Sequence, residues 1–132
     1  SVLQSDYILF QRPVAISVEG NDLYVVDEGL RRIFHFDRTL QTLTPFAPGI
    51  PVEFGTNIYA AQDMTVYITV PSLGKVAHFT RDGNALPALV SRDRLARPIA
   101  VAVNEYDGNV FVVDALYNHI VEFTRLGNMV SI

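Results

Sequence analysis

The strongest constraint on the fold is a segment that the chain repeats. Arg12-Pro13-Val14-Ala15-Ile16 returns 85 residues later as Arg97-Pro98-Ile99-Ala100-Val101. This separation equals two periods of about 42 to 43 residues, and an altered middle copy stands at Gly55-Thr56-Asn57-Ile58-Tyr59. We therefore expect one supersecondary unit, written three times, rather than a single irregular domain.

Each copy contains short apolar segments separated by turn residues. The second segments align as Leu23–Asp27, Val66–Val70 and Val110–Asp114, and the third segments align as Ile33–Phe36, Val76–Phe79 and Ile120–Phe123. Short β-branched and aromatic segments with a turn about every eight to twelve residues are typical of all-β proteins. The sequence therefore predicts an all-β chain of antiparallel strands.

The expected strands fall into four classes by their place in the repeat. The innermost strands are expected at Val14–Val18, Asn57–Ala61 and Ile99–Val103, and the second strands at Leu23–Val26, Thr65–Thr69 and Val110–Val113. The third strands are expected at Arg32–Asp37, Lys75–Arg81 and His119–Arg125, and the outer strands at Leu40–Phe46, Ala85–Ser91 and Asn128–Ile132. Val2–Phe10 is expected to be one more outer strand.

Composition excludes several classes of function. The chain has 132 residues, 49% of them hydrophobic and 18% charged, which suits one globular domain. The net charge is −4 and the basic residues form no stripe, which disfavours nucleic-acid binding. There is no cysteine, which excludes disulfides and thiolate catalysis. No apolar run is long enough to suggest a membrane partner, and the compartment stays unassigned.

The three copies resemble NHL repeats. The NHL pattern has a proline before an inner strand, a Gly/Asp turn, an aliphatic strand ending in Asp, a polar loop with a basic residue, and a Phe-containing strand. Asp27 with Arg32 fits this pattern, and Asp114 with His119 fits it at the same spacing, whereas the middle copy has Val70 there. The resemblance covers residues 12–128 and implies blades of a β-propeller, each with four antiparallel strands.

The resemblance implies a single NHL-like domain over residues 1–132. Residues 12–54, 55–96 and 97–132 would form the three blades, and residues 1–11 would supply the outer strand of a preceding or partner blade. Three blades leave open faces, because NHL propellers usually close with six. Two alternatives stay open: the chain is half of a longer protein, or two chains exchange strands and form a six-bladed homodimer ring.

In propellers, ligands bind where loops converge at one mouth of the channel, so the loop residues are candidates. The expected ligand-binding residues are Arg12, Glu28, Arg31, Glu53, Arg97, Tyr117 and Asn118. A second set is expected to act as a structural clamp rather than as acid and base, through backbone N–H bonds and ion pairs. These are Asp27, Arg32, Asp114 and His119.

No catalytic residue, metal site or cofactor is predicted. His35 and His78 occupy one repeat position in different blades, and they would not converge on a single zinc ion, whose ligands lie about 2 Å away. We therefore expect a non-catalytic scaffold that binds a protein, a peptide or a second copy of itself. The alternative is a metal-dependent lyase or a lactonase-like hydrolase, since some NHL-like propellers are zinc-dependent lyases. RNA recognition, known in other NHL proteins, is disfavoured by the acidic charge balance.

Overall fold

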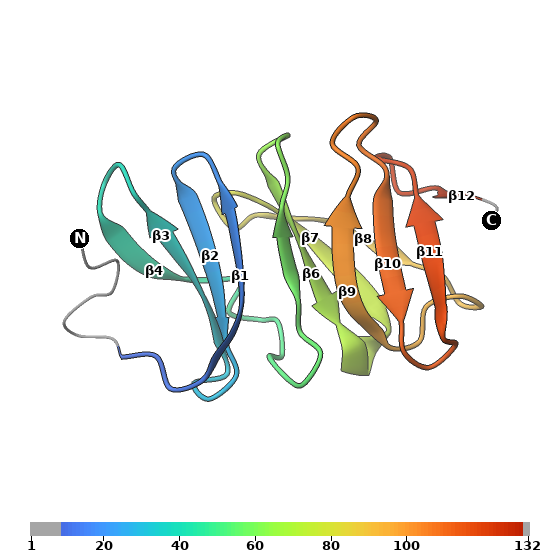
Figure 1. Ribbon diagram of the computed structural model, residues 1–132, viewed down its shortest axis with the longest axis horizontal. Helices are drawn as coiled ribbons and strands as arrows, with labels where there is room; N and C mark the ends of the chain where they lie inside the picture. The colour runs from blue at the N-terminus through green and yellow to red at the C-terminus, as the bar shows by residue number, and fades with distance from the viewer. Residues whose placement is uncertain (1–8, 131–132) are drawn as a thin grey trace.

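The computed structural model describes residues 9–130 and confirms the all-β expectation, with three separate four-stranded antiparallel sheets (Figure 1). The first sheet contains β1 (Pro13–Glu19), β2 (Asp22–Asp27), β3 (Arg32–Asp37) and β4 (Thr42–Phe46). The second contains β5 (Ile58–Ala60), β6 (Thr65–Val70), β7 (Lys75–Thr80) and β8 (Ala85–Val90). The third contains β9 (Pro98–Val103), β10 (Val110–Asp114), β11 (His119–Phe123) and β12 (Met129–Val130).

We call these sheets blades 1, 2 and 3. Within each blade the strands are hydrogen-bonded in chain order, from the innermost to the outermost. One short 3-10 helix, η1 (Pro71–Leu73), follows β6. Among residues 9–130 there is no helix with the length and hydropathy to cross a membrane.

The strand bounds differ from the sequence expectation at the strand ends. β5 has 3 residues and begins at Ile58 rather than Asn57, because the N–H of Asn57 donates to the Thr69 hydroxyl instead of a backbone carbonyl. Most of the expected strand Val2–Phe10 lies outside the described residues. Phe10 is described, lies outside any strand, and packs against Phe34 with ring centroids 5.7 Å apart.

The core lies between the blades, because each strand turns alternate side chains to the blade before it and the blade after it. One cluster joins blades 1 and 2, where Tyr24, Val26 and Ile33 pack with residues such as Ile58 and Ile68. A second cluster joins blades 2 and 3 and includes Tyr67, Val76, Val110, Val112 and Phe123. The arrangement explains why the strands read as nearly continuous apolar segments.

Within residues 9–130, each of the two end blades has one face with no neighbouring blade. Ile33 and Val76 are 2% and 0% exposed, but Ile120, at the same repeat position in blade 3, is 57% exposed. On the other side, Ile58 is 4% exposed, but Ile16, which pairs with Val25 as Ile58 pairs with the equivalent Ile68, is 63% exposed. These two repeat positions are therefore buried inside the stack and exposed at its ends, although Val25, Phe34 and Phe36 on the outer side of blade 1 are buried.

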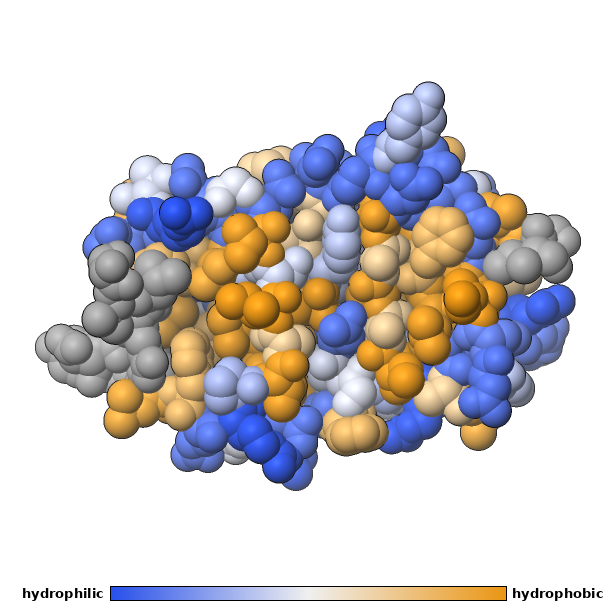
Figure 2. All heavy atoms as spheres, viewed as in Figure 1, coloured by the Kyte–Doolittle hydropathy of each residue, from blue (hydrophilic) through white to orange (hydrophobic). Residues whose placement is uncertain are grey.

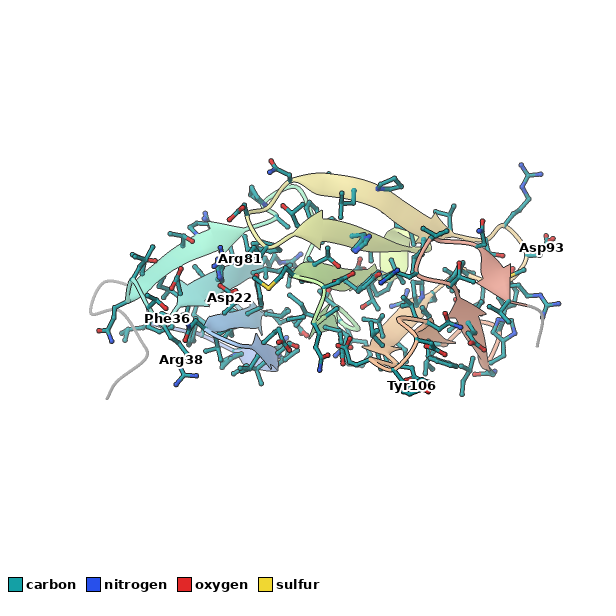
Figure 3. The ribbon with its side chains drawn as sticks, turned by 90° about the horizontal axis from the view of Figure 1, so that it is seen from above. Asp22, Phe36, Arg38, Arg81, Asp93 and Tyr106 are labelled. Carbon is teal, nitrogen blue, oxygen red and sulfur yellow. The ribbon has the colours of Figure 1, made fainter. Side chains whose placement is uncertain are left out.

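Figure 2 shows the side of the molecule formed by the innermost strands, with hydrophobic residues across its middle and hydrophilic residues at both loop ends. Val14, Ile16 and Val18 of β1 are among the exposed large hydrophobic residues. Viewed from above, the blades stand next to each other in chain order (Figure 3). On this side, the polar residues therefore lie mainly on the loops at the two ends of the blades.

Candidate binding site at the mouth loops

Two kinds of loop meet at one end of each blade, the lower end in Figure 1. One kind leads into the innermost strand, and the other joins the second strand to the third. We call them together the mouth loops. Their backbones are directly bonded: the N–H of Glu28 donates to the carbonyl of Arg12 at 2.9 Å, and that of Ala115 donates to Arg97 at 2.9 Å. The same junction therefore recurs in blades 1 and 3.

Asp114 holds the junction of blade 3 together. Its Oδ2 accepts the backbone N–H groups of Ala96 and Arg97, at 2.7 and 2.8 Å. Its Oδ1 accepts those of Leu116 and Tyr117, at 3.0 and 2.9 Å. One buried carboxylate thus fixes both mouth loops of the blade through their backbones alone.

Asp27 does the same in blade 1. It accepts the backbone N–H groups of Gln11 at 2.8 Å, Arg12 at 3.0 Å and Leu30 at 2.9 Å. Burial alone would raise the pKa of Asp27, but these backbone donors outweigh it and hold the pKa below its ordinary value. The balance is the same for Asp114, so both side chains are carboxylates at neutral pH and unsuited to donate a proton.

The basic residues five positions later are not ion-paired with these aspartates within the described chain. Arg32 and His119 stand opposite Asp27 and Asp114 in the strand register. His119 Nε2 instead makes a hydrogen bond with the carbonyl oxygen of Arg94, at 2.7 Å. The junctions therefore depend on carboxylate-to-backbone bonds, without the ion pairs that the spacing predicted.

Blade 2 lacks the aspartate and replaces it with a hydroxyl. Thr69 Oγ1 accepts the backbone N–H of Asn57 at 2.7 Å and donates to the carbonyl of Gly55 at 2.8 Å. Glu53 adds a second link, because its Oε2 accepts the backbone N–H of Ser72 at 3.1 Å. The middle junction is thus held by neighbouring residues, although Val70 occupies the aspartate position.

The structure brings only some of the expected ligand-binding residues together. Arg12 and Glu28 form an ion pair across the blade 1 junction. Arg31 and Asn118 occupy equivalent positions with φ of 55° and 56°, and Gly74 is their counterpart in blade 2 with φ of 63°. This left-handed residue closes each loop before the third strand.

The remaining expected residues lie on the mouth loops of separate blades. Tyr117 is next to His119, with ring centroids 5.5 Å apart. Arg97 contributes its backbone N–H to the Asp114 junction, and its side chain is exposed. Together these residues make a mixed polar and charged rim rather than one enclosed pocket.

A polar network that the sequence reasoning missed lies at the opposite end, between blades 1 and 2 (Figure 3). Arg81 donates from Nε and Nη2 to the two carboxylate oxygens of Asp22, at 2.9 and 2.6 Å. His35 Nε2 also contacts Asp22, at 2.7 Å. The hydrogen bond from Arg81 lowers the pKa of Asp22 despite its burial, and the contact with His35 lowers it further.

A signal for this network exists in the sequence. Arg38, Arg81 and Arg125 follow the third segment of each copy, at the spacing of the repeat.

Among residues 9–130, no group of three or more His, Cys, Asp or Glu side chains is placed to hold a metal ion.

Comparisons with known proteins agree on the fold. No family model matches the chain, and no curated protein matches it. Virginiamycin B lyase from Staphylococcus aureus is similar in structure, with a TM-score of 0.70 and 18% identity, over 89% of this chain and 40% of that chain.

A chain of the nidogen/laminin complex matches with a TM-score of 0.73 and 15% identity, over 88% of this chain and 45% of that one. Hydrazine synthase from Kuenenia stuttgartiensis matches with a TM-score of 0.71 and 13% identity, over 98% of this chain and 38% of that one. The chain thus spans less than half the length of each of these three matched chains. The first two neighbours are β-propellers, so the three sheets are propeller blades and the chain has the form of a half-propeller.

Proposed function

We propose that this chain is an NHL-like half-propeller that acts as a non-catalytic interaction scaffold. Two copies complete one six-bladed ring, and the mouth loops of the ring bind a protein or peptide. The observation that carries the proposal is that Ile16 and Ile120 are exposed at the two ends of the stack, although their equivalents inside it are buried. Large exposed apolar faces mark sites of association.

Charge complementarity supports a second copy as the occupant of these faces. In a two-chain ring, blade 1 of one copy would follow blade 3 of the other. Arg38 would then reach toward that blade as Arg81 reaches toward Asp22, because Arg38 and Arg81 occupy one repeat position. Blade 3 carries Glu122 and Asn109 at the positions of His35 and Asp22, and these two are hydrogen-bonded at 2.7 Å. Arg38 would therefore meet an acidic side chain.

The mouth loops suit recognition of a protein or peptide. Their backbones are fixed by Asp27, Asp114 and Thr69, so that less conformational freedom is lost on binding. Their side chains, including Arg12, Arg97 and Tyr117, remain exposed or partly exposed. A rigid scaffold with variable side chains is the arrangement that binding loops generally use.

The molar mass in solution tests the assembly. Light scattering after size exclusion should give twice 14.7 kDa for the unmodified chain. Arg38→Glu should shift the mass to one chain, and adding Glu122→Arg should restore the dimer by reversing both charges. Lys75→Glu, a charge reversal on β7 of the middle blade, is the matched control and should leave the dimer intact. A monomer at every concentration, or an Arg38→Glu protein that stays dimeric, contradicts the proposal.

The alternative is a metal-dependent lyase or lactonase-like hydrolase, and one observation favours it: a structural neighbour is a lyase. The ring proposed above would bring the innermost strands of both copies to one channel. Elemental analysis of the purified protein separates the two functions. Zinc or calcium in stoichiometric amount, together with turnover of a lactone, would replace the scaffold with the enzyme.

A further inference from the structure

A pocket of about 450 Å³ lies between blades 2 and 3, at the end opposite the mouth loops. Its lining includes Asp63, Tyr67, Glu105, Tyr106, Gly108 and Arg125. Tyr106 extends from the β9–β10 loop at its rim (Figure 3). The pocket belongs to one chain, so it does not depend on the ring proposed above.

The same location between blades 1 and 2 is almost completely filled. The equivalent space there has a volume of about 10 Å³. Its lining residues Tyr24, Met64 and Arg81 occupy the repeat positions of Tyr67, Gly108 and Arg125. The space at this repeat position is therefore filled by side chains between blades 1 and 2 and is a pocket between blades 2 and 3.

Two substitutions within the repeat account for the difference. Asp22 is replaced by Thr65, which keeps the contact with the neighbouring histidine, His78, at 2.7 Å but has no carboxylate for the arginine. Met64 is replaced by Gly108, whose φ is +80° and where an added Cβ would lie 3.1 Å from Arg125 Cδ.

As a result, the guanidinium of Arg125 forms no ion pair within residues 9–130, whereas the guanidinium of Arg81 binds both carboxylate oxygens of Asp22. At the second interface no carboxylate takes the place of Asp22, and the Arg125 side chain lies close to Gly108, at the position that Met64 has in the first interface. A guanidinium fork facing such a space favours a bidentate carboxylate.

Acidic groups line the same pocket without contacting Arg125 at ion-pair distance in the described chain. Glu105 Oε2 accepts the Tyr59 hydroxyl at 3.0 Å and the Gln62 N–H at 3.2 Å. Asp63 Oδ1 accepts the N–H of Thr65 at 3.0 Å. In each case the second carboxylate oxygen makes no hydrogen bond to a described residue.

Asp63 and Arg125 have opposite effects on the pKa of Tyr67, which also lines the pocket. Burial raises the pKa of Tyr67 to about 12, with a further rise from Asp63 and opposing effects from a hydrogen bond with Thr65 and from Arg125. The cation and the two anions line the same cavity, and no ion pair joins them within residues 9–130. A ligand with a single charge would satisfy one set and be repelled by the other.

We propose that this pocket binds a small zwitterion of the α-amino-acid class with an apolar side chain. Its carboxylate binds Arg125 in the place that Asp22 takes beside Arg81. Its ammonium group binds Asp63 and Glu105. Its side chain contacts Val103 and Ala61, two apolar residues of the lining.

A ¹H–¹⁵N NMR titration of the chain with L-phenylalanine tests the proposal. Saturable shifts are expected at Gly108, at Arg125 and in the residues between them. Phenethylamine and 3-phenylpropanoate each carry one of the two charges, and each should bind at least about tenfold more weakly, as expected for loss of a charge-assisted hydrogen bond. No saturable shift with L-phenylalanine or L-leucine, or equal binding of 3-phenylpropanoate, overturns the proposal.

Two variants and one control locate the binding. Arg125→Gln should weaken L-phenylalanine binding at least about tenfold, while Lys75→Gln, at the mouth end of blade 2, should leave it unchanged. Thr65→Asp should abolish binding, because it supplies Arg125 with the partner that Arg81 already has. Undiminished binding by Arg125→Gln or by Thr65→Asp, or an equal loss in Lys75→Gln, contradicts the assignment.

Discussion

Replacing Asp114 with Asn is the most direct test of how the mouth loops are held. The carboxylate accepts four backbone N–H groups from two loops. An asparagine keeps the shape and one acceptor oxygen, but its NH₂ group would oppose the two N–H groups that faced the other oxygen. Hydrogen bonds to a charged group contribute about 1.5 to 3 kcal/mol each, and solvent near exposed Arg97 reduces this, so the expected loss is about 2 to 4 kcal/mol.

Urea denaturation and thermal melting would measure the loss. For a chain of this length about 2 to 4 kcal/mol corresponds to roughly 6 to 15 °C in melting temperature. Asp93→Asn is the control, since Asp93 is exposed and accepts no hydrogen bond from a described residue. It should change the free energy of unfolding by less than about 0.5 kcal/mol.

The pH dependence of the stability difference distinguishes the charge of Asp114 from its packing. The pKa of Asp114 in the folded chain lies below the ordinary value of 3.8. Its stabilisation is therefore complete above the unfolded-state pKa and disappears as the pH falls through the folded-state pKa. The difference in stability between the unmodified chain and Asp114→Asn should shrink below about pH 4. A loss no larger than that of Asp93→Asn, or one independent of pH, would refute the reasoning.

Three other changes test separate contacts. Asp22→Asn should cost about 2 to 4 kcal/mol in urea denaturation, because Arg81 would lose its buried carboxylate partner; a change within error would show that the pair is unimportant. Thr69→Val should cost about 1 to 3 kcal/mol and increase amide hydrogen exchange at Asn57, whose N–H loses its acceptor; unchanged exchange would contradict this role. Burial lowers the pKa of His78 below 6.5, so the unfolded chain binds a proton that the folded chain does not, and stability should fall as the pH drops below 6.5. In His78→Gln the fall in stability at low pH should be smaller, as measured by urea midpoints at several pH values. The same pH dependence in both proteins would contradict this role of His78.

The sequence was sufficient for the blades because their signal is local. Segments such as Leu23–Val26 carry β-branched residues between turns, and the repeat places them in register, so the observed strands follow the expected ones closely. Asp27 and Asp114 stood out for the same reason: each ends a strand in its own copy. A short-range pattern needs no knowledge of which blades touch.

The rest depended on contacts between blades. Arg81 and Asp22 are 59 residues apart, and although the repeat spacing marks the position of the arginine, it does not indicate which residue of the neighbouring blade Arg81 binds. The role of Thr69 was hidden by Val70, since a hydroxyl one position earlier took over a task expected of a carboxylate. The pocket beside Arg125 is lined by residues of two blades, and the equivalent space between the other two blades is almost filled. Neither fact can be known before the blades are placed against one another.

The bonds made by Asp27 and Asp114 have a consequence for how this protein can change over time. Each carboxylate grips only main-chain groups, which every residue except proline offers alike. Mutations among the surrounding loop side chains therefore leave the loop path intact. The chemistry of this rim can therefore change by single substitutions, without the framework having to be rebuilt each time.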